Sequence, residues 1–510
     1  MSRLVESSPV SRRTDSPPAD SFLVNRRMAA AVVALYLLWA TLLLTNLDMN
    51  LLGPEELGQV FNDMAVRLLT WDFHISPDAI LWEAFVRNGE TYTYFGIFPA
   101  LIRMPFVLAG YTNLNVSRLS CLVALGITIY SYVRILQAAQ RRWIASPKQG
   151  WIGSASMLGM ILSGPGVYLL ASASLYHELI FWAAALTASS ARIVMQSWFE
   201  ESELGAGELI SLAVLAGLCL LCRAPEGIGL YACLLLLLVR RFVRGVALTS
   251  AGDLAGRLQS FAVALCIGLF SLLFVIALAI VNYKRWGNPF EIGPLQYYVQ
   301  LQKHQEWLDI YMRHGIFSWI RVSVASMYYL FALKIEVLSP NIFNNYYGYI
   351  EGPRSLFILC APLTIVLSFC GLVLVSRHPR KNAVPLLFVI GQSVGSILVL
   401  GFPALTLRYT FIFWGALMPL AAVGLERYRG MIVWPRIATG ALTALLLIGL
   451  VASHLMLLRY KIVSVATMPA VRYELTRAVR PLLCPGAPID DNVRLTDLHP
   501  LITPSCPPIW

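Results

Sequence analysis

Acidic side chains gather between Asp48 and Tyr111, although the chain as a whole is basic. This stretch holds eight acids and three arginines, whereas the 510-residue chain has a formal net charge of +11. A carboxylate at the boundary between water and lipid can stay ionised and act as a general base on a hydroxyl group that reaches it. Asp48, directly after the first apolar run, is the first candidate for this catalytic role, and Asp63 is the second.

Glu55 and Glu56 lie between these two aspartates and are expected to help bind a substrate. If residues 54–69 form a helix, Glu56 and Asp63 are seven positions apart and share one face of it. A solvated acidic face without any chemistry is the alternative for each of these side chains taken singly.

The segment 89–106, GETYTYFGIFPALIRMPF, combines turn formers with aromatic rings. Its glycines allow turns and its two prolines interrupt a helix, so the segment is too broken to span a bilayer. We expect a partly embedded loop in which Tyr92 and Tyr94 hold a sugar or a lipid chain. Plain packing of the loop is the alternative.

Tyr176, His177 and Glu178 stand together at the start of an apolar run. An ionisable group inside a membrane helix costs about 2.5–3.5 kcal/mol at the bilayer centre and less near its edge. These residues therefore need either a partner or a function. We expect them to take part in substrate binding, and a simple pairing with an arginine is the alternative.

Arg223, Arg408 and Tyr409 mark two other helix ends. The planar guanidinium group of arginine offers several donors and suits phosphate oxygens. Two arginines that converge on one side of the membrane would fit a lipid phosphate. Arginines that only extend their charged heads to the interface are the alternative.

Several kinds of site are missing from the sequence. The chain has no glycine-rich phosphate loop and its histidines are scattered singly, so neither a cofactor nor a metal site is predicted. The Gly-x-Ser-x-Gly match around Ser393 lies inside an apolar run. We interpret it as a helix-packing surface rather than as a nucleophile elbow.

The elements that position these residues are membrane helices. With 57% apolar and only 13% charged residues, the composition excludes an ordinary soluble domain. Basic residues form short clusters between apolar runs, which indicates orientation in a bilayer rather than binding of nucleic acid. About eleven apolar runs are long enough to span. They are 28–47, 116–138, 151–172, 178–198, 208–223, 226–240, 259–281, 355–376, 384–401, 409–425 and 434–456.

We therefore expect an all-α polytopic membrane protein whose amino terminus lies in the cytoplasm. Seven of the nine cysteines lie in apolar runs, where they are expected to be small buried side chains. Cys484 and Cys506 can form a disulfide only if the tail that carries them is extracytoplasmic. The expected parts are a disordered cytoplasmic tail (1–27), a transmembrane domain (28–456) with a helical first outer loop (48–115) and a second outer segment (282–354), and an extracytoplasmic tail (457–510).

The order of these features resembles the GT-C superfamily of integral-membrane glycosyltransferases, which take sugars from polyprenyl-phosphate carriers. The similar stretches, between about residues 48 and 424, are the acidic loop after the first span, YTYFGIFPALIRMP, LYHE before a span, GLCLLCRAPEG, NYKRWGNPFEIG after the seventh span and TLRY before a late one. The resemblance implies a GT-C-like fold with a catalytic base in the first outer loop, where Asp48 and Asp63 lie. The paired acidic motif usual in the superfamily is missing here.

The resemblance also implies direct displacement at the extracytoplasmic face of the inner (plasma) membrane. A loop carboxylate would deprotonate an acceptor hydroxyl, which would attack the anomeric carbon of a polyprenyl-phosphate sugar and release the lipid phosphate. Arg223 and Arg408 would stabilise that phosphate, while Tyr92, Tyr94 and the segment 282–311 would hold sugar and lipid. The acceptor would be a glycan, a lipid or a protein.

Two other classes of membrane protein stay open. A polytopic transporter or a lipid flippase would place ionisable groups or broken helices near the middle of the membrane, whereas the charged residues here gather at its outer boundary. A polysaccharide polymerase or ligase would also have polar outer loops, but it would use an oligosaccharide linked through a diphosphate.

Overall fold

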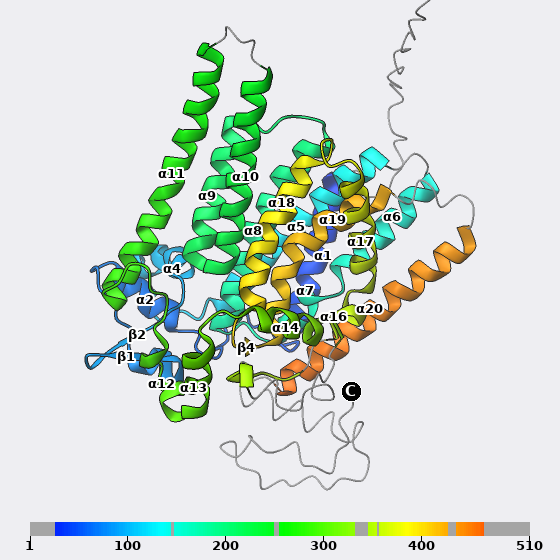
Figure 1. Cartoon of the computed structure of the whole chain (residues 1–510). Coiled ribbons are helices and arrows are strands. Elements are labelled where there is room, and N and C mark those ends of the chain that lie inside the picture. The colour runs from blue at the N-terminus through cyan, green and yellow to red at the C-terminus, as the bar shows by residue number, and fades with distance from the viewer. Residues whose placement is uncertain are drawn as a thin grey trace, which may run out of the picture.

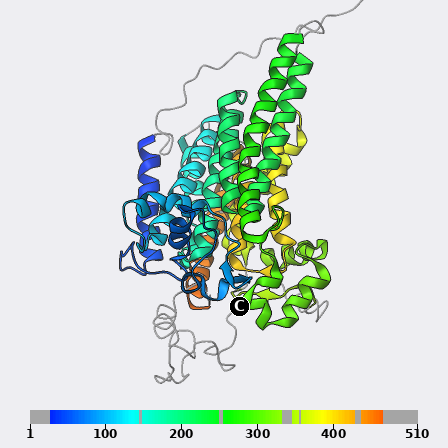
Figure 2. The same ribbon diagram turned by 90° about the vertical axis from the view of Figure 1, so that its left-hand side faces the viewer.

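The computed structural model describes residues 26–143, 147–248, 254–331, 345–353, 356–426 and 435–463. Its regular structure is almost entirely helical, and the long helices run alongside one another in a bundle (Figures 1 and 2). Most of the two predicted tails lies outside the described residues. The proposed disulfide between Cys484 and Cys506 lies there as well.

A helix lies in each of the eleven apolar runs found in the sequence. The helices of the bundle are α1 (Arg26–Leu44), α5 (Ser117–Trp143), α6 (Pro147–Ile161), α8 (Leu175–Phe199), α9 (Ala206–Cys222), α10 (Ala224–Leu248), α11 (Leu254–Trp286), α17 (Pro362–Arg377), α18 (Ala383–Leu400), α19 (Trp414–Gly424) and α20 (Pro435–Val463). Within the described ranges, six helices are long and apolar enough to cross a membrane. A bent pair, Ile152–Ile161 with Pro165–Ala171, would make a seventh. The prediction of an all-α membrane protein is therefore confirmed, whereas a count of about eleven spans is not reached by this measure.

The shorter elements gather at one end of the bundle, which we call the loop end (Figures 1 and 2). From the first long connection come α2 (Val60–Leu68), α3 (Pro77–Ile80), η1 (Leu81–Glu83), β1 (Phe85–Arg87), β2 (Glu90–Tyr92) and α4 (Phe98–Leu108). Further along the chain follow α7 (Pro165–Tyr168), η2 (Leu169–Ala171), η3 (Leu295–Tyr297), α12 (Val299–Lys303), α13 (Gln305–His314), α14 (Trp319–Phe331), β3 (Tyr349–Ile350), α16 (Phe357–Cys360), β4 (Ala404–Leu405) and η5 (Leu407–Phe413). The helix predicted over 54–69 is shorter in the structure and begins at Val60, because turns occupy the chain before that residue.

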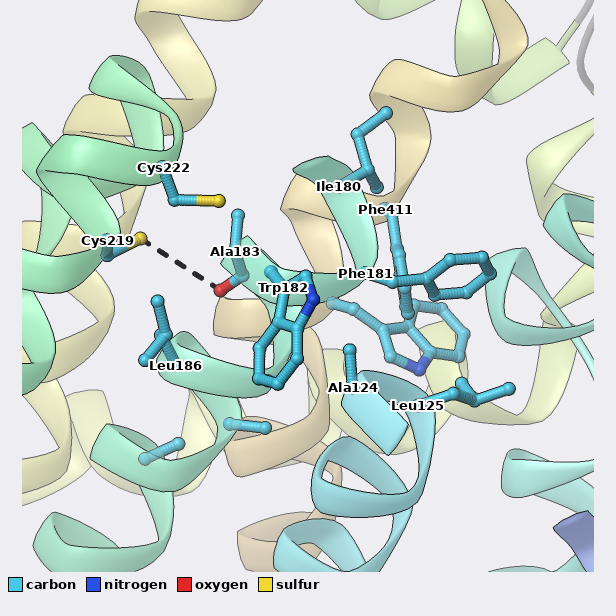
Figure 3. Packing of buried hydrophobic residues seen from close by; sticks show 14 of the residues in the cluster. Ala124, Leu125, Ile180, Phe181, Trp182, Ala183, Leu186, Cys219, Cys222 and Phe411 are labelled. Carbon is cyan, nitrogen blue, oxygen red and sulfur yellow. Dashed lines mark hydrogen bonds between the residues drawn. The ribbon is translucent and has the colours of Figure 1, made fainter. Parts of the chain in front are cut away.

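The centre of the bundle is built on α8, whose side chains are buried on nearly every face. In Figure 3 the Phe181 ring, which is fully buried, meets the ring of Phe411 edge to face at 5.9 Å. Elsewhere, glycines let helices approach closely. A Cβ added to Gly391 or Gly395 would lie 2.5 Å from the backbone of α10. This close approach agrees with the interpretation of the Gly-x-Ser-x-Gly match as a helix-packing surface.

Two small sheets at the loop end were not predicted. In the hairpin β1–β2, Arg87 pairs with Glu90 across a two-residue turn formed by Asn88 and Gly89. Both turn residues have positive φ (53° and 83°), the backbone that a tight hairpin turn requires and that an Asn-Gly pair adopts easily. The second sheet pairs Tyr349–Ile350 with Ala404–Leu405 in parallel. These two sheets position part of the site described next.

Candidate functional site

Arginines, tyrosines and glutamates from distant segments meet at the loop end. We call this group the loop-end cluster. Its members, joined by hydrogen bonds, ion pairs, ring contacts and electrostatic interactions, are Glu83, Tyr94, Tyr176, Arg223, Glu226, Tyr298, Tyr349, Glu351, Arg408 and Tyr409.

Arg408 is placed by the small parallel sheet. It follows β4 closely, while Glu351 follows β3 and donates its N–H to the carbonyl of Leu405 at 2.8 Å. Nη1 of Arg408 donates to Oε2 of Glu351 at 2.6 Å, and its Cζ lies 4.3 Å from the ring centroid of Tyr176. Arg408 is only 8% exposed. A charged partner and an aromatic face together fix its orientation.

Arg223 lies at the break between α9 and α10. Its backbone is extended (φ −150°, ψ 112°), which ends one helix before the next begins. Its guanidinium group pairs with Glu226 and lies 5.2 Å from the ring centroid of Tyr409. Arg408 lies 5.9 Å from the same centroid. The two arginines predicted to converge therefore share one tyrosine ring.

The segment that carries Tyr94 reaches the cluster because Gly96 has no side chain. A Cβ at Gly96 would overlap the backbone carbonyl oxygens of Leu221 and Cys222, at the end of α9. This close approach places the chain after the hairpin directly beside the helix break that presents Arg223. The rings of Tyr94 and Phe95 also contact each other, tilted by 35° with centroids 4.3 Å apart.

Glu83 supplies a carboxyl group to the cluster from η1, immediately before the hairpin. It is 7% exposed, and its Oε1 accepts a hydrogen bond from the Tyr298 hydroxyl at 2.8 Å. Tyr176 also hydrogen-bonds to it. Burial raises the pKa of Glu83 above its ordinary value, although these two hydroxyls and the charge of Arg408 act in the opposite direction. Burial likewise raises the pKa of Tyr298, so that its hydroxyl stays a donor.

The charges of the cluster nearly cancel. Two guanidinium groups face three carboxyl groups, and each arginine already has a glutamate partner, Glu226 for Arg223 and Glu351 for Arg408. The third carboxyl group, Glu83, accepts hydrogen bonds from the hydroxyls of Tyr298 and Tyr176. A phosphate that binds either arginine therefore has to replace a glutamate or share the arginine with it.

Asp48 and Glu55 belong to a separate network around Arg118. Glu55 Oε1 accepts from Nε of Arg118 at 2.7 Å, and its Oε2 accepts from the N–H of Ala173 at 3.1 Å. Asp48 is half exposed (55% of its side chain) and lies 3.8 Å from Arg118. The carbonyl of the partly buried Glu56 accepts from the N–H of Leu175 at 3.4 Å, next to Tyr176.

Asp63 takes part in a third network, which joins α2 to the hairpin. Its two oxygens accept from the N–H and hydroxyl of Ser76 at 2.8 and 2.6 Å and from Arg67 at 3.1 Å. Arg67 also pairs with Asp72 at 2.6 Å. Burial works against the charge of Asp72, but hydrogen bonds from His74 and Arg67 outweigh it and lower the pKa of Asp72.

Tyr92 lies at the far end of this third network rather than in the loop-end cluster. Its hydroxyl is 2.8 Å from Nε2 of His74, whose Nδ1 lies 2.6 Å from Asp72. Its ring also packs against Trp286, with centroids 5.7 Å apart. Carboxylate, imidazole and phenol thus form a continuous hydrogen-bonded chain.

Glu178 and His177 are buried inside the bundle. Glu178 receives two hydrogen bonds from Arg103, at 2.6 and 2.8 Å, and one from Ser120 at 2.6 Å. The pairing with an arginine named above as the alternative is therefore what the structure contains. His177 Nδ1 lies 2.8 Å from the Ser174 hydroxyl, and its Nε2 has no hydrogen-bond partner among the described residues.

The structure thus brings together Tyr94, Tyr176, Arg223, Arg408 and Tyr409 of the predicted site residues. The other seven lie in neighbouring networks. Tyr298 lies in the segment 282–311 that was expected to hold sugar and lipid, whereas Glu83, Glu226, Tyr349 and Glu351 were not predicted as site residues. The Asn-Gly hairpin signal just after Glu83 was available, but Glu351 becomes visible only when distant segments meet.

Among the residues that the structure describes, no group of three or more His, Cys, Asp or Glu side chains could hold a metal ion. No protein-family model matches the chain, and comparison with curated proteins gives no match.

Proposed function

We propose that this chain is an integral-membrane glycosyltransferase that moves a sugar from a polyprenyl-phosphate donor to a glycan, lipid or protein acceptor. The observation that carries the proposal is the loop-end cluster, where Arg223 and Arg408 share the ring of Tyr409 beside the carboxyl group of Glu83. Guanidinium groups suit phosphate oxygens, and tyrosine rings offer flat apolar faces with a polar edge.

The proposed reaction is a single displacement. The acceptor hydroxyl oxygen attacks the anomeric carbon while the bond from that carbon to the phosphate oxygen breaks. The phosphate leaves with the electron pair and is stabilised by Arg223 and Arg408, because negative charge grows on it during the step. The acceptor proton passes to a carboxylate.

Glu83 is the carboxyl group best placed to take that proton. It lies among the tyrosines of the cluster, and burial moves its pKa toward neutrality, where a general base works best. Asp48 remains a candidate base from the sequence because its side chain is half exposed. Asp63 is the weaker candidate, since both its oxygens already accept hydrogen bonds.

In this proposal all eleven apolar runs cross the plasma membrane in a GT-C-like arrangement, and the loop end faces the extracytoplasmic side. The basic clusters between apolar runs support that orientation. The short helices α9 and α17, with 17 and 16 residues, would each cover about 25 Å and would span together with their flanking turns.

The test is transfer of radiolabelled sugar from a panel of polyprenyl-phosphate donors in membranes that contain the protein. Wild type is compared with Glu83→Gln, Asp48→Asn and Asp63→Asn. We expect Glu83→Gln to lower the rate at least about a hundredfold, as loss of a general base does. Absence of transfer from every donor would remove the proposal. Normal transfer by Glu83→Gln together with a loss in Asp48→Asn would move the base to Asp48.

A transporter or lipid flippase is the second candidate. Two observations favour it: the 45° bend in the pair Ile152–Ile161 with Pro165–Ala171, and the buried Glu226 in the bundle. Broken helices and intramembrane acids are common in transporters. Movement of a labelled polyprenyl-phosphate sugar across vesicles, without transfer to an acceptor, would favour this candidate over the enzyme.

A further inference from the structure

A small cavity lies inside the bundle, beside the loop-end cluster. Its volume is about 10 Å³, and its walls come from α5, α8, α10, η5 and α19. Apolar side chains such as Ile180 and Phe411, both labelled in Figure 3, form part of it. A space of this size is just large enough to hold one water molecule.

Two polar side chains line the cavity without a partner for one of their atoms. Glu226 is 5% exposed, and its Oε1 pairs with Arg223, but its Oε2 has no hydrogen-bond partner among the described residues. The hydroxyl of Thr187 also has no hydrogen-bond partner among the described residues, and its side chain is 4% exposed. Its polar neighbour is the thiol of Cys219, which is a weak hydrogen-bonding group.

Gln392 lies beside the cavity rather than in its lining. It is 2% exposed, and a Cβ at Gly415, which lines the cavity, would be 2.8 Å from Oε1 of Gln392 and from Cγ2 of Thr187. The side chain of Gln392 also has a hydrogen bond with the thiol of Cys233. Oε2 of Glu226 and the hydroxyl of Thr187 are therefore the polar atoms of the lining that lack a partner among the described residues.

Leaving these groups unpaired is costly. A buried polar atom without a partner costs about 1–3 kcal/mol, and a charged one costs more. Water offers two donors and two acceptor sites. It can donate to Oε2 of Glu226, and the Thr187 hydroxyl can donate to the water or accept from it. A buried water makes two to four hydrogen bonds, so these two groups are enough to hold one.

We propose that this cavity is a binding site for one water molecule, which bridges Glu226 to Thr187. A monovalent cation fits less well, because Arg223 already neutralises Glu226. The water fixes Glu226 from inside the bundle and thereby helps to hold Arg223 in place. The inference is independent of the reaction proposed above.

The sign of a stability change tests the proposal. Thr187→Val replaces the hydroxyl with a methyl group of similar size. If that hydroxyl binds the water, the thermal unfolding midpoint of the detergent-solubilised protein should fall by about 1–3 °C. Ser190→Ala is the matched control, because Ser190 is a buried hydroxyl of the same helix that already donates to the carbonyl of Leu186 at 2.9 Å. We expect both variants to shift the midpoint downward.

A dry cavity predicts the opposite result. Thr187→Val would then remove an unsatisfied polar group, and the midpoint would stay equal or rise, which would overturn the proposal. A density map that resolves ordered water gives a second test. One peak within hydrogen-bonding distance of Glu226 and Thr187 supports the water. No peak, or an anomalous signal at that place after soaking in Tl⁺, overturns it.

Discussion

Buried charges in this protein are compensated by side chains that lie far away in the sequence. Arg408 pairs with Glu351 and Arg103 pairs with Glu178, and in each pair the two side chains are at least 90% buried. An isolated buried charge would be very costly, so such a pair must form when the helices assemble.

Arg408→Lys tests phosphate recognition at the residue scale. Lysine keeps the charge but loses the planar group that can face Tyr176 and bind two oxygens at once. We expect the apparent affinity for the polyprenyl-phosphate donor to fall about tenfold or more. The control is Arg321→Lys, another buried arginine at the loop end, whose partners are the carbonyls of Tyr346 and Gly315. Equal donor affinity in both variants would contradict a phosphate role for Arg408.

Glu83→Gln tests the electrostatics of the same cluster. Because burial raises the pKa of Glu83, the folded protein binds its proton more tightly than the unfolded chain does. Between the ordinary pKa and the raised one, the free energy of unfolding therefore falls as pH rises. Thermal unfolding at pH 5 and pH 8 measures this loss of stability, and Glu83→Gln should lose less stability between the two pH values than wild type does. Parallel pH profiles for the two proteins would show that the pKa of Glu83 is not raised.

At the scale of elements, the site depends on connections rather than on long helices. The Asn88-Gly89 turn sets the hairpin beside Glu83, the helix break at Arg223 presents one arginine, and the pairing of β3 with β4 sets Glu351 beside Arg408. Each of these three features is a short non-helical segment at the loop end. The long helices hold these segments in place.

Gly96→Ala tests how the hairpin segment docks on α9. The added methyl group would overlap two carbonyl oxygens at the end of that helix, and backbone cannot move aside as a flexible side chain can. We expect a loss of about 1–3 kcal/mol in the free energy of unfolding and a clear loss of sugar transfer. Gly207→Ala, where nothing lies within 4 Å of the added atom, is the control and should be neutral or slightly stabilising. Similar behaviour of both variants would exclude the close approach.

Glu178→Gln tests the buried pair that joins α4 to α8. Loss of the carboxylate leaves Arg103 charged and uncompensated, at a cost of about 3–5 kcal/mol. The double variant Arg103→Met with Glu178→Leu removes both charges and should recover most of this loss. Thermal unfolding of the three proteins measures it. A double variant as unstable as Glu178→Gln would mean that the uncompensated charge of Arg103 is not the cause of the lost stability.

At the scale of the whole molecule, the bundle has two different ends. The loop end carries the long connections and the cluster, whereas the connections that the structure describes at the opposite end, 200–205 and 378–382, are short (Figures 1 and 2). Exposed side chains mark both ends. Trp71 and Phe290 are 73% and 90% exposed at the loop end, and the side chain of Glu201 is 78% exposed beyond the far end of α8.

Labelling of single cysteines tests this arrangement in membranes. A membrane-impermeant maleimide added from outside should modify Trp71→Cys and Phe290→Cys and leave Glu201→Cys unmodified until the membrane is opened. This result follows from the proposed extracytoplasmic position of the loop end. Labelling of Trp71→Cys and Phe290→Cys from different sides would contradict the fold itself. Labelling of both from the cytoplasm would reverse only the orientation.

The sequence by itself determined that this is a helical membrane protein and where its helices lie. Hydropathy is a local property, and a run of about twenty apolar residues must satisfy its backbone hydrogen bonds within a helix wherever the rest of the chain goes. The same local reasoning picked out Arg223, Arg408 and Tyr409, because polar residues at the ends of apolar runs are conspicuous in the sequence.

Only the tertiary structure decided which of those residues share a site. The sequence favoured Asp48 and Asp63 over the other acids of the stretch, Glu83 among them, yet the first two lie in networks with Arg118 and Arg67, while Glu83 lies with the tyrosines and Arg408. The physical reason is that an ion pair forms over a few ångströms of space and is indifferent to separation along the chain. Which carboxylate meets which guanidinium group is therefore set by the packing of the helices.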